Sequence, residues 1–263
     1  MTGPVAQPPP TPAMMPKRRP VIPPPPRRLQ PSRFAVAGDM PRRGWPDAVS
    51  WPDTGIFLVL GSDAHLPEQF RRHFRGRVRV ANGVAREVRG HARTSPPADA
   101  APREHHRYDA ASNAVRELLV ADRTLPIVEL EEDDLAAVDL VMAQLKALEA
   151  EPTKRHAGEA QIIVLAEKAA RSHPTQVVLT NDGGASVVAQ KHGLRSRHAG
   201  DVLAEMACAN PDMDAGELWS VFSHCVTFTA PPSHARPTSD QDLRCRRQQD
   251  SCPTCDEVER STT

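Results

Sequence analysis

Four acidic residues of this chain have the chemistry to hold a divalent cation together. They are Asp63, Glu87, Glu159 and Asp182. Carboxylates that are brought close together repel one another unless a cation neutralises them. Their oxygens are hard ligands that suit Mg²⁺ or Mn²⁺, and such an ion can activate water and stabilise the charge that develops when a phosphodiester is hydrolysed. If the fold gathers these side chains, they form a metal-dependent hydrolytic site.

Each acid also has a purely structural interpretation. Glu159 could be a first-turn acid that the helix dipole favours, and Asp182 could cap the following helix or form a turn. Glu87 could be a surface residue in a salt bridge, and Asp63 a turn residue. Taken singly, these interpretations are the simpler ones, so the metal site depends on whether the four acids meet in the fold.

The middle of the chain alternates between apolar runs and helical patterns. Continuous apolar runs at 56–60, 125–130 and 176–180 predict buried strands, and the alternation at 77–80 predicts a short one. Helices are predicted over 67–74, 82–91, 109–121, 134–149, 158–171, 185–192, 201–208 and 214–222. This order predicts an α/β fold, in which helices cover both faces of a central parallel sheet.

The acids fall where such a sheet binds its ligands, beyond the carboxyl ends of the strands. Asp63 follows the run at 56–60, and Asp182 follows the run at 176–180. Glu159 opens a predicted helix, and Glu87 lies within another. We therefore expect the four carboxylates to converge at one edge of the sheet.

Four stretches of sequence carry a resemblance to a known family. HAGEAQIIVLAEKAA (156–170) places Gly-Glu-Ala at the start of an Ala-rich helix, and QVVLTNDGGASVVAQKHGL (176–194) has a strand that ends in Thr-Asn-Asp. RVRVANGVAREVRG (77–90) has a short strand before a helix that bears an acid, and IFLVLGSDAHL (56–66) has an apolar run followed by an acid. Together they resemble the PIN-domain family, a metal-dependent ribonuclease fold that includes VapC-type toxins.

The resemblance implies a three-layer α/β/α domain that hydrolyses the phosphodiester bonds of RNA. It implies that Asp63, Glu87, Glu159 and Asp182 form the catalytic, metal-binding set for Mg²⁺ or Mn²⁺, with Glu87 holding metal or orienting the attacking water. Thr180 and Asn181 are the first candidates for further polar contacts in the site. The expected partners are an RNA substrate and, if the protein is the toxin of a toxin–antitoxin pair, an antitoxin protein. A homodimer is a further expectation.

The stretch nearest the N-terminus, IFLVLGSDAHL (56–66), departs from the family pattern. In the family the acid comes directly off the strand, at the place of Gly61, whereas Asp63 comes two residues later. Either a small bulge displaces the strand end and Asp63 serves, or the first ligand is lost. In the second case the protein would be a catalytically degenerate PIN-like module that binds RNA or a protein partner.

Composition sets the predicted domain boundaries. The chain has 263 residues, and 15 of its 27 prolines lie in the first 52 residues. This predicts a disordered Pro/Arg-rich tail over 1–52, a PIN-like domain over 53–228 and a second, polar disordered tail over 229–263. Lysine plus arginine (33) equals aspartate plus glutamate (33), which argues against nucleic-acid binding by net charge alone. No apolar run approaches the roughly 20 residues of a membrane span, so a cytoplasmic protein is expected.

Two other kinds of site have little support in the sequence. No GxGxxG or Walker loop follows a predicted strand, which weakens the alternative of a nucleotide-binding domain. The spacing of Cys252 and Cys255 is that of a zinc knuckle or a redox motif, but the pair lies in the polar tail without regularly spaced further ligands. We expect an unstructured tail there, in a reducing compartment.

Overall fold

Short parallel strands form the centre of the part of the chain that the computed structural model describes, which is residues 48–120, 125–148, 156–172, 175–210 and 212–244. One sheet has the order β1-β4-β5, and β2 pairs with β3 in a second. The strands are β1 (Val49–Pro52), β2 (Val80–Ala81), β3 (Ile127–Val128), β4 (Gln176–Leu179) and β5 (Arg195–Arg197). The predicted mixed α/β fold with a parallel sheet is confirmed.

Backbone hydrogen bonds join the two sheets. The Ser50 amide donates to the Arg77 carbonyl at 2.7 Å, and the Arg79 amide donates to the Ser50 carbonyl at 3.0 Å. The strands therefore follow one another in the order β3-β2-β1-β4-β5. The chain leaves β1 toward β2 and β3, whereas it leaves β4 toward β5. In parallel sheets a reversal of this kind opens a crevice at the carboxyl ends of the two central strands.

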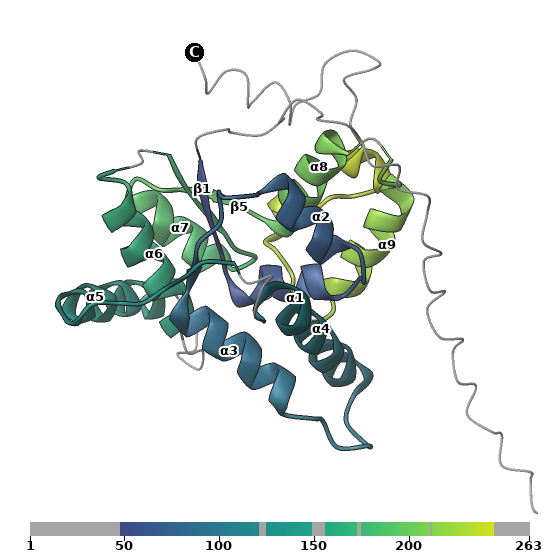
Figure 1. The fold of residues 1–263 in the computed structure, drawn as a ribbon, viewed down its shortest axis with the longest axis horizontal. Helices are drawn as coiled ribbons and strands as arrows, with labels where there is room; N and C mark the ends of the chain where they lie inside the picture. The colour runs from purple at the N-terminus through teal and green to yellow at the C-terminus, as the bar shows by residue number, and fades with distance from the viewer. Residues whose placement is uncertain (1–47, 121–124, 149–155, 173–174, 211, 245–263) are drawn as a thin grey trace, which may run out of the picture. The chain divides into compact units, whose positions relative to one another are not determined.

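The helices flank these strands (Figure 1). They are α1 (Thr54–Gly61), α2 (Leu66–His73), α3 (Asn82–Arg93), α4 (Pro102–Leu118), α5 (Leu135–Lys146), α6 (Ala157–Ala169), α7 (Gly183–Lys191), α8 (Ala199–Ala209) and α9 (Ala215–Cys225). In Figure 1, α6 and α7 lie to the left of β1 and β5, and α2 and α8 lie to the right. All eight predicted helices are present. The largest shift is at α4, which starts at Pro102, a residue suited to the first turn of a helix.

The apolar run at 56–60 was predicted as a strand, and this prediction is wrong: the run forms most of helix α1. The Asp53 side chain caps the helix by accepting a hydrogen bond from the Ile56 amide at 2.8 Å. Every residue of α1 except Gly55 is buried. A helix that is enclosed on all sides has no polar stripe, so over five residues its sequence looks like that of a buried strand. The true first strand, β1, precedes it.

The C-terminal segment, residues 229–244, packs against the domain instead of extending from it as the sequence predicted. Leu243 is fully buried in the core, where the 3₁₀ turn Asp240–Leu243 contacts α8 and α9. Pro237 lies at the start of α8, where its Cγ would be 2.6 Å from a Cβ placed on Gly200. The predicted tails at 1–47 and 245–263, including Cys252 and Cys255, lie outside the described residues. No helix among the described residues is long and apolar enough to cross a membrane.

Candidate active site

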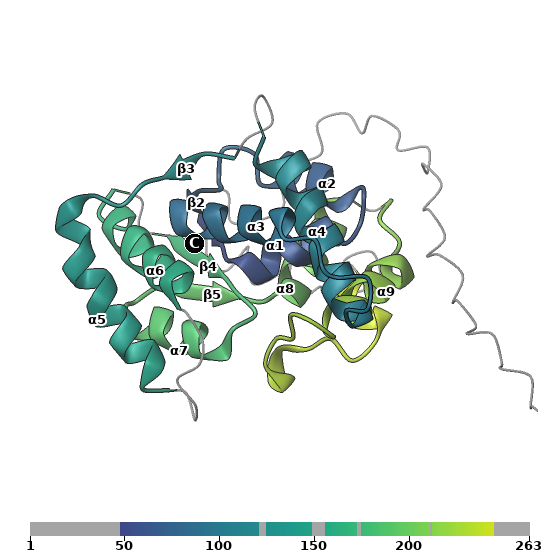
Figure 2. The same cartoon turned by 90° about the horizontal axis from the view of Figure 1, so that it is seen from below.

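Four carboxylates meet at the carboxyl edge of the sheet, and three of them were predicted. Asp53 follows β1 directly, and Asp182 follows β4 and caps α7 by accepting from the Ala185 amide at 2.9 Å. The ends of β1 and β4 are neighbours, because Pro52 pairs with Leu179. Glu159 lies in the first turn of α6, and Glu87 lies within α3. We call Asp53, Glu87, Glu159 and Asp182 the carboxylate site. Figure 2 shows α6, whose first turn carries Glu159, beside β4 and β5.

Asp63 does not belong to this site. The eight residues of α1, about 12 Å of helix, separate it from Asp53. Its Oδ1 accepts from the amides of His65 and Leu66 at 2.8 and 3.1 Å, which makes it the turn residue of its structural interpretation. The sequence signal for Asp53 was present: an Asp just before an apolar run is typical of a helix N-cap. Because the run was assigned to a strand, the acid at the other end of it was chosen.

Asp53 is the most buried acid of the site, with 5% of its surface exposed. Burial raises its pKa to about 6, although hydrogen bonds from Thr180, Ile56 and Asn181 partly offset this effect, and the nearby charge of Asp182 adds to it. The strand end and the helix start thus hold this carboxylate firmly. With a pKa of about 6, Asp53 is mostly ionised at neutral pH and takes up a proton readily as the pH falls.

Thr180 and Asn181 support the acids instead of facing a ligand. Both are buried, and the Thr180 hydroxyl accepts a hydrogen bond from the Asp182 amide at 2.9 Å. The Asn181 amide nitrogen donates to the Thr229 carbonyl at 3.1 Å, and its Oδ1 accepts from the Ala199 amide at 2.9 Å. Asn181 therefore links the end of β4 to α8 and to the C-terminal segment. Both residues therefore make polar contacts within the site, and these contacts position the acids.

Glu159 is the acid with the least support from the surrounding protein. Its side chain is 21% exposed, and among the described residues its buried Oε2 has no hydrogen-bond partner; His156 Nδ1 is 4.0 Å away. Burial, and after it the nearby charges of Asp53, Glu87 and Asp182, raise the pKa of Glu159 to about 8. The charges of all three other acids act on Glu159, which is consistent with four carboxylates in one region.

Glu87 forms the exposed rim of the site. Its side chain is 42% exposed, its Oε2 accepts from the Thr54 hydroxyl at 2.8 Å, and its Oε1 is 3.7 Å from His91 Nε2. Burial pushes the pKa of Glu87 up, but His91, Thr54 and the charge of Arg107 outweigh it, so the pKa lies below its ordinary value. A Cβ on Gly158 would come within 3.3 Å of Glu87 Oε2, so glycine lets α6 approach α3 closely here.

The donor set fits a hard divalent cation, because it consists of carboxylate oxygens. Within the described residues, no three His, Cys, Asp or Glu side chains already stand at the spacing of a coordination sphere. Asp53 and Asp182 each cap a helix with one oxygen, and Glu87 is turned toward Thr54. Binding by all four would require their carboxylates to rotate toward one another. The buried Oε2 of Glu159 has no hydrogen-bond partner among the described residues, so it can coordinate a cation without breaking a hydrogen bond.

No protein-family model, curated protein or solved structure matches this chain. The PIN-domain resemblance therefore stays a hypothesis, and the function is inferred from the geometry of the chain's own side chains.

Proposed function

We propose that the protein is a metal-dependent ribonuclease of PIN-like type, in which the carboxylate site holds Mg²⁺ or Mn²⁺. The observation that carries this proposal is Glu159: a buried glutamate oxygen without a hydrogen-bond partner in the described residues, among three other acids. A structural salt bridge would place a lysine or arginine there. An acid cluster at the carboxyl ends of two central strands has the composition of a cation site.

The chain's own residues would divide the work by position. A bound Mg²⁺ or Mn²⁺ supplies an activated water and offsets the charge that develops on the phosphodiester. Asp53 is fixed by β1 and α1, and Asp182 by β4 and α7, so they give the site rigid ligands. Glu159 can hold a proton near neutral pH and release it as a cation binds. Glu87, exposed and ionised, can accept a proton from the attacking water.

Asp53 also weakens the alternative of a catalytically degenerate module. That alternative depended on the displaced position of Asp63. Asp53 comes directly off a strand and is followed by the small residues Thr54 and Gly55, which is the pattern that the resemblance requires at the first acid. The three-layer arrangement, the RNA substrate, an antitoxin partner and a homodimer belong to the same proposal.

The test is RNA cleavage by the purified full chain, with Mn²⁺ or Mg²⁺ and with a chelator. We expect cleavage only with metal. The Asp53→Asn variant should lose about 100-fold or more in rate, equivalent to roughly 3 kcal/mol of barrier. The matched control is Asp63→Asn, which makes the same chemical change outside the site and should keep its rate within about threefold. Absence of cleavage by the unmutated chain with both metals would refute the nuclease, and equal losses in both variants would refute this ligand set.

A further inference from the structure

Basic side chains continue outward from the rim of the carboxylate site. His91 lies one turn beyond Glu87 on α3, and its Nε2 is 2.9 Å from Nη2 of Arg107 on α4. The Nε of Arg107 is enclosed by the protein, so only the Nη atoms can face a ligand. One Nη2 donor goes to His91 Nε2, and the remaining Nη donors stay available for an anionic ligand. Arg107 therefore puts a positive charge next to an acidic site that would act on a phosphodiester.

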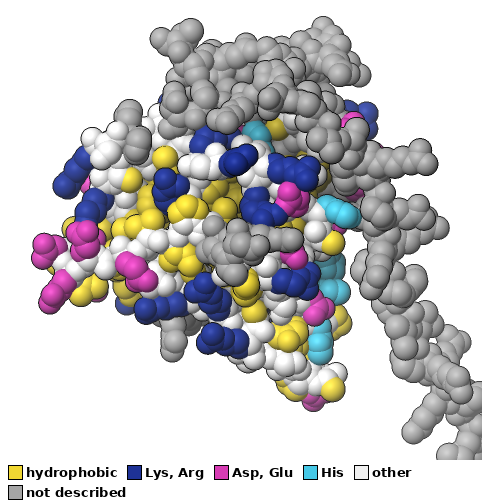
Figure 3. Space-filling view, in the orientation of Figure 1, with side chains coloured by type: hydrophobic (Ala, Val, Ile, Leu, Met, Phe, Trp, Pro, Cys, Tyr) yellow, Lys and Arg dark blue, Asp and Glu magenta, His cyan; other side chains and the backbone are white. Residues whose placement is uncertain are grey.

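Aromatic rings meet between α4 and the end of α9, and one of them, His106, is the residue before Arg107 on α4. The rings of His106 and His224 are 4.2 Å apart and edge-on, and His224 lies 6.1 Å from the ring of Phe228. Phe228 packs on the buried cluster of Leu58, Ala110 and Ala111, which fixes the platform from below. Histidines gather along the right-hand edge of the face in Figure 3. His224 is exposed, so one of its surfaces is open to a ligand.

We propose that the ledge formed by His91, His106, Arg107, His224 and Phe228 binds a single strand of RNA. A backbone phosphate would lie at Arg107 and His91, and a base would stack on the His224 ring. Proteins bind single strands through this combination of a positive track and aromatic platforms, because every base has a face that can stack. A duplex keeps its bases stacked inside, so it would use the phosphate contact alone. The inference rests on the proposed nuclease function and adds the path by which the substrate reaches Glu87.

Burial and the neighbouring His106 lower the pKa of His224, which favours the neutral form of its ring. A neutral imidazole serves as a stacking surface without drawing in anions on its own. The charge on the ledge then comes from Arg107, which remains protonated at every pH of interest. The two parts of the ledge can therefore be tested separately. The contribution of Arg107 is measured by the salt dependence of binding, and that of His224 by replacing its ring.

The experiment measures the affinity of the full chain for a labelled single-stranded oligoribonucleotide in a chelating buffer, where cleavage does not interfere. We expect Arg107→Gln to weaken binding about tenfold and to reduce the slope of log K against log salt by about 0.7, the value for one lost phosphate contact on a single strand. His224→Ala should weaken binding by at least about fivefold with an unchanged slope, and His224→Phe should restore it.

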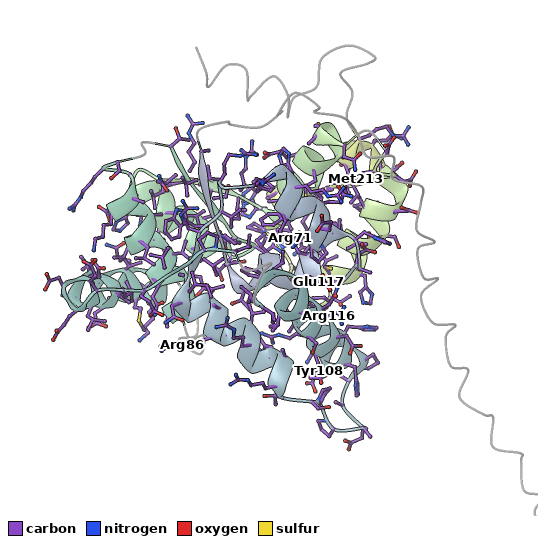
Figure 4. The ribbon with its side chains drawn as sticks, viewed as in Figure 1. Arg71, Arg86, Tyr108, Arg116, Glu117 and Met213 are labelled. Carbon is purple, nitrogen blue, oxygen red and sulfur yellow. The ribbon has the colours of Figure 1, made fainter. Side chains whose placement is uncertain are left out.

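The matched control for charge is Arg116→Gln on the same helix. Arg116 is exposed and hydrogen-bonded to Glu117 and Asn113, toward the carboxyl end of α4, with Tyr108 nearer the other end (Figure 4). This variant should bind like the unmutated chain. Thermal melting checks that each variant is folded, and Arg107→Lys provides a second variant that keeps the charge and should retain most of the affinity.

Three results would overturn the ledge: no measurable binding of the single strand, an Arg107→Gln affinity and slope equal to those of the unmutated chain, or equally tight binding of a duplex of the same sequence. Tighter binding of the matching single-stranded DNA would overturn RNA as the ligand. Binding with these variant effects but without metal-dependent cleavage would support the ledge and refute the nuclease. If Arg107→Gln and His224→Ala leave metal-dependent cleavage unchanged, the nuclease is supported and the ledge is refuted.

Discussion

Two glutamates of this protein, the buried Glu205 and the partly buried Glu159, have opposite electrostatic surroundings. Glu205 on α8 is 3% exposed; its Oε1 lies 2.7 Å from His73 Nε2, and its Oε2 pairs with Arg197. Burial raises the pKa of Glu205, but His73, Arg197 and Arg77 outweigh burial, and the pKa lies below its ordinary value. Glu159 is partly buried among acids, and its pKa is raised to about 8.

The difference separates a structural acid from a candidate ligand. The fold supplies Glu205 with its own cations, so its charge is satisfied and stabilises the packing of α8 against α2. It supplies Glu159 with like charges, so the ionised form is costly until a cation arrives from solution. A perturbed pKa alone does not mark a functional site, because ion pairs also perturb it. What points to function here is the direction of the shift, together with the lack of a lysine or arginine paired with Glu159 among the described residues, where His156 is the nearest basic group at 4.0 Å.

The largest expected effect is on the free energy of unfolding, when the charge of Glu205 or of Glu159 is removed in separate variants. Glu205→Gln removes the buried carboxylate that pairs with Arg197, and breaking a buried pair in this way costs about 3–5 kcal/mol of unfolding free energy. Glu159→Gln removes a repelling charge of nearly the same shape, so the metal-free fold should be equally or more stable at pH 8. Urea unfolding of both variants and the unmutated chain measures these differences. Equal destabilisation of the two variants would contradict the comparison.

A second prediction uses pH to sharpen the same contrast. In the unfolded chain Glu159 loses its proton near the ordinary value of 4.5, whereas in the folded chain it keeps the proton up to about pH 8. Between these values the folded state binds more protons, so raising the pH favours unfolding by up to about 1.4 kcal/mol per pH unit for this group. Asp53 adds to the loss between its ordinary pKa of 3.8 and about 6.

Glu159→Gln should remove most of this pH dependence between pH 6 and 8. Glu205→Gln should keep it, because the pKa of Glu205 is lowered and its contribution is lost only as the pH falls below about 4.5. The measurement is the unfolding free energy of each variant across this pH range in a chelating buffer. A curve for Glu159→Gln parallel to that of the unmutated chain would mean that the Glu159 carboxyl is not the group that titrates.

The third prediction concerns metal and stability, independently of any activity. A cation that binds only the folded chain stabilises it by about 2.7 kcal/mol when its free concentration is 100 times the dissociation constant. We expect Mn²⁺ to raise the melting temperature at pH 8 and to do so much less at pH 5, because protons compete for Glu159 and Asp53. Asp182→Asn should weaken the effect. Ca²⁺ and Mn²⁺ acting equally at both pH values would indicate nonspecific binding.

Most of the fold was predictable from the sequence, because helices with one apolar face and buried strands bounded by turns have distinct patterns. The helices α6 and α7 and the strand β4 between them were predicted with small shifts at their ends, and with them Glu159 and Asp182. These acids lie beside elements with a clear pattern. Three carboxylates of the site were found for this reason.

The remainder could not be predicted, for reasons that lie in tertiary packing. β1 is only four residues long, contains Ser50 and ends in Pro52, and it is a strand because all four residues pair with β4. The Trp51 ring nitrogen adds a hydrogen bond to the Gln176 side chain at 2.8 Å. β5 (Arg-Ser-Arg) carries no apolar signal at all. The C-terminal segment is polar, yet one leucine, Leu243, anchors it in the core. Local sequence does not contain these partners, so β1 was not recognised, the helix α1 was assigned as the first strand, and the acid after it was chosen in place of Asp53.

The smallest expected effect tests whether Asp63, which was predicted as a ligand, is a turn residue outside the carboxylate site. Asp63→Ala removes the carboxylate oxygen that accepts from the amides of His65 and Leu66 at the start of α2. Loss of such a cap costs about 1 kcal/mol of unfolding free energy. Because Asp63 lies outside the carboxylate site, the stabilisation by Mn²⁺ at pH 8 should be the same as in the unmutated chain. The measurement is a pair of melting curves, with and without Mn²⁺. If Asp63→Ala keeps its stability but loses the response to Mn²⁺, then Asp63 is a ligand and Asp53 does not replace it.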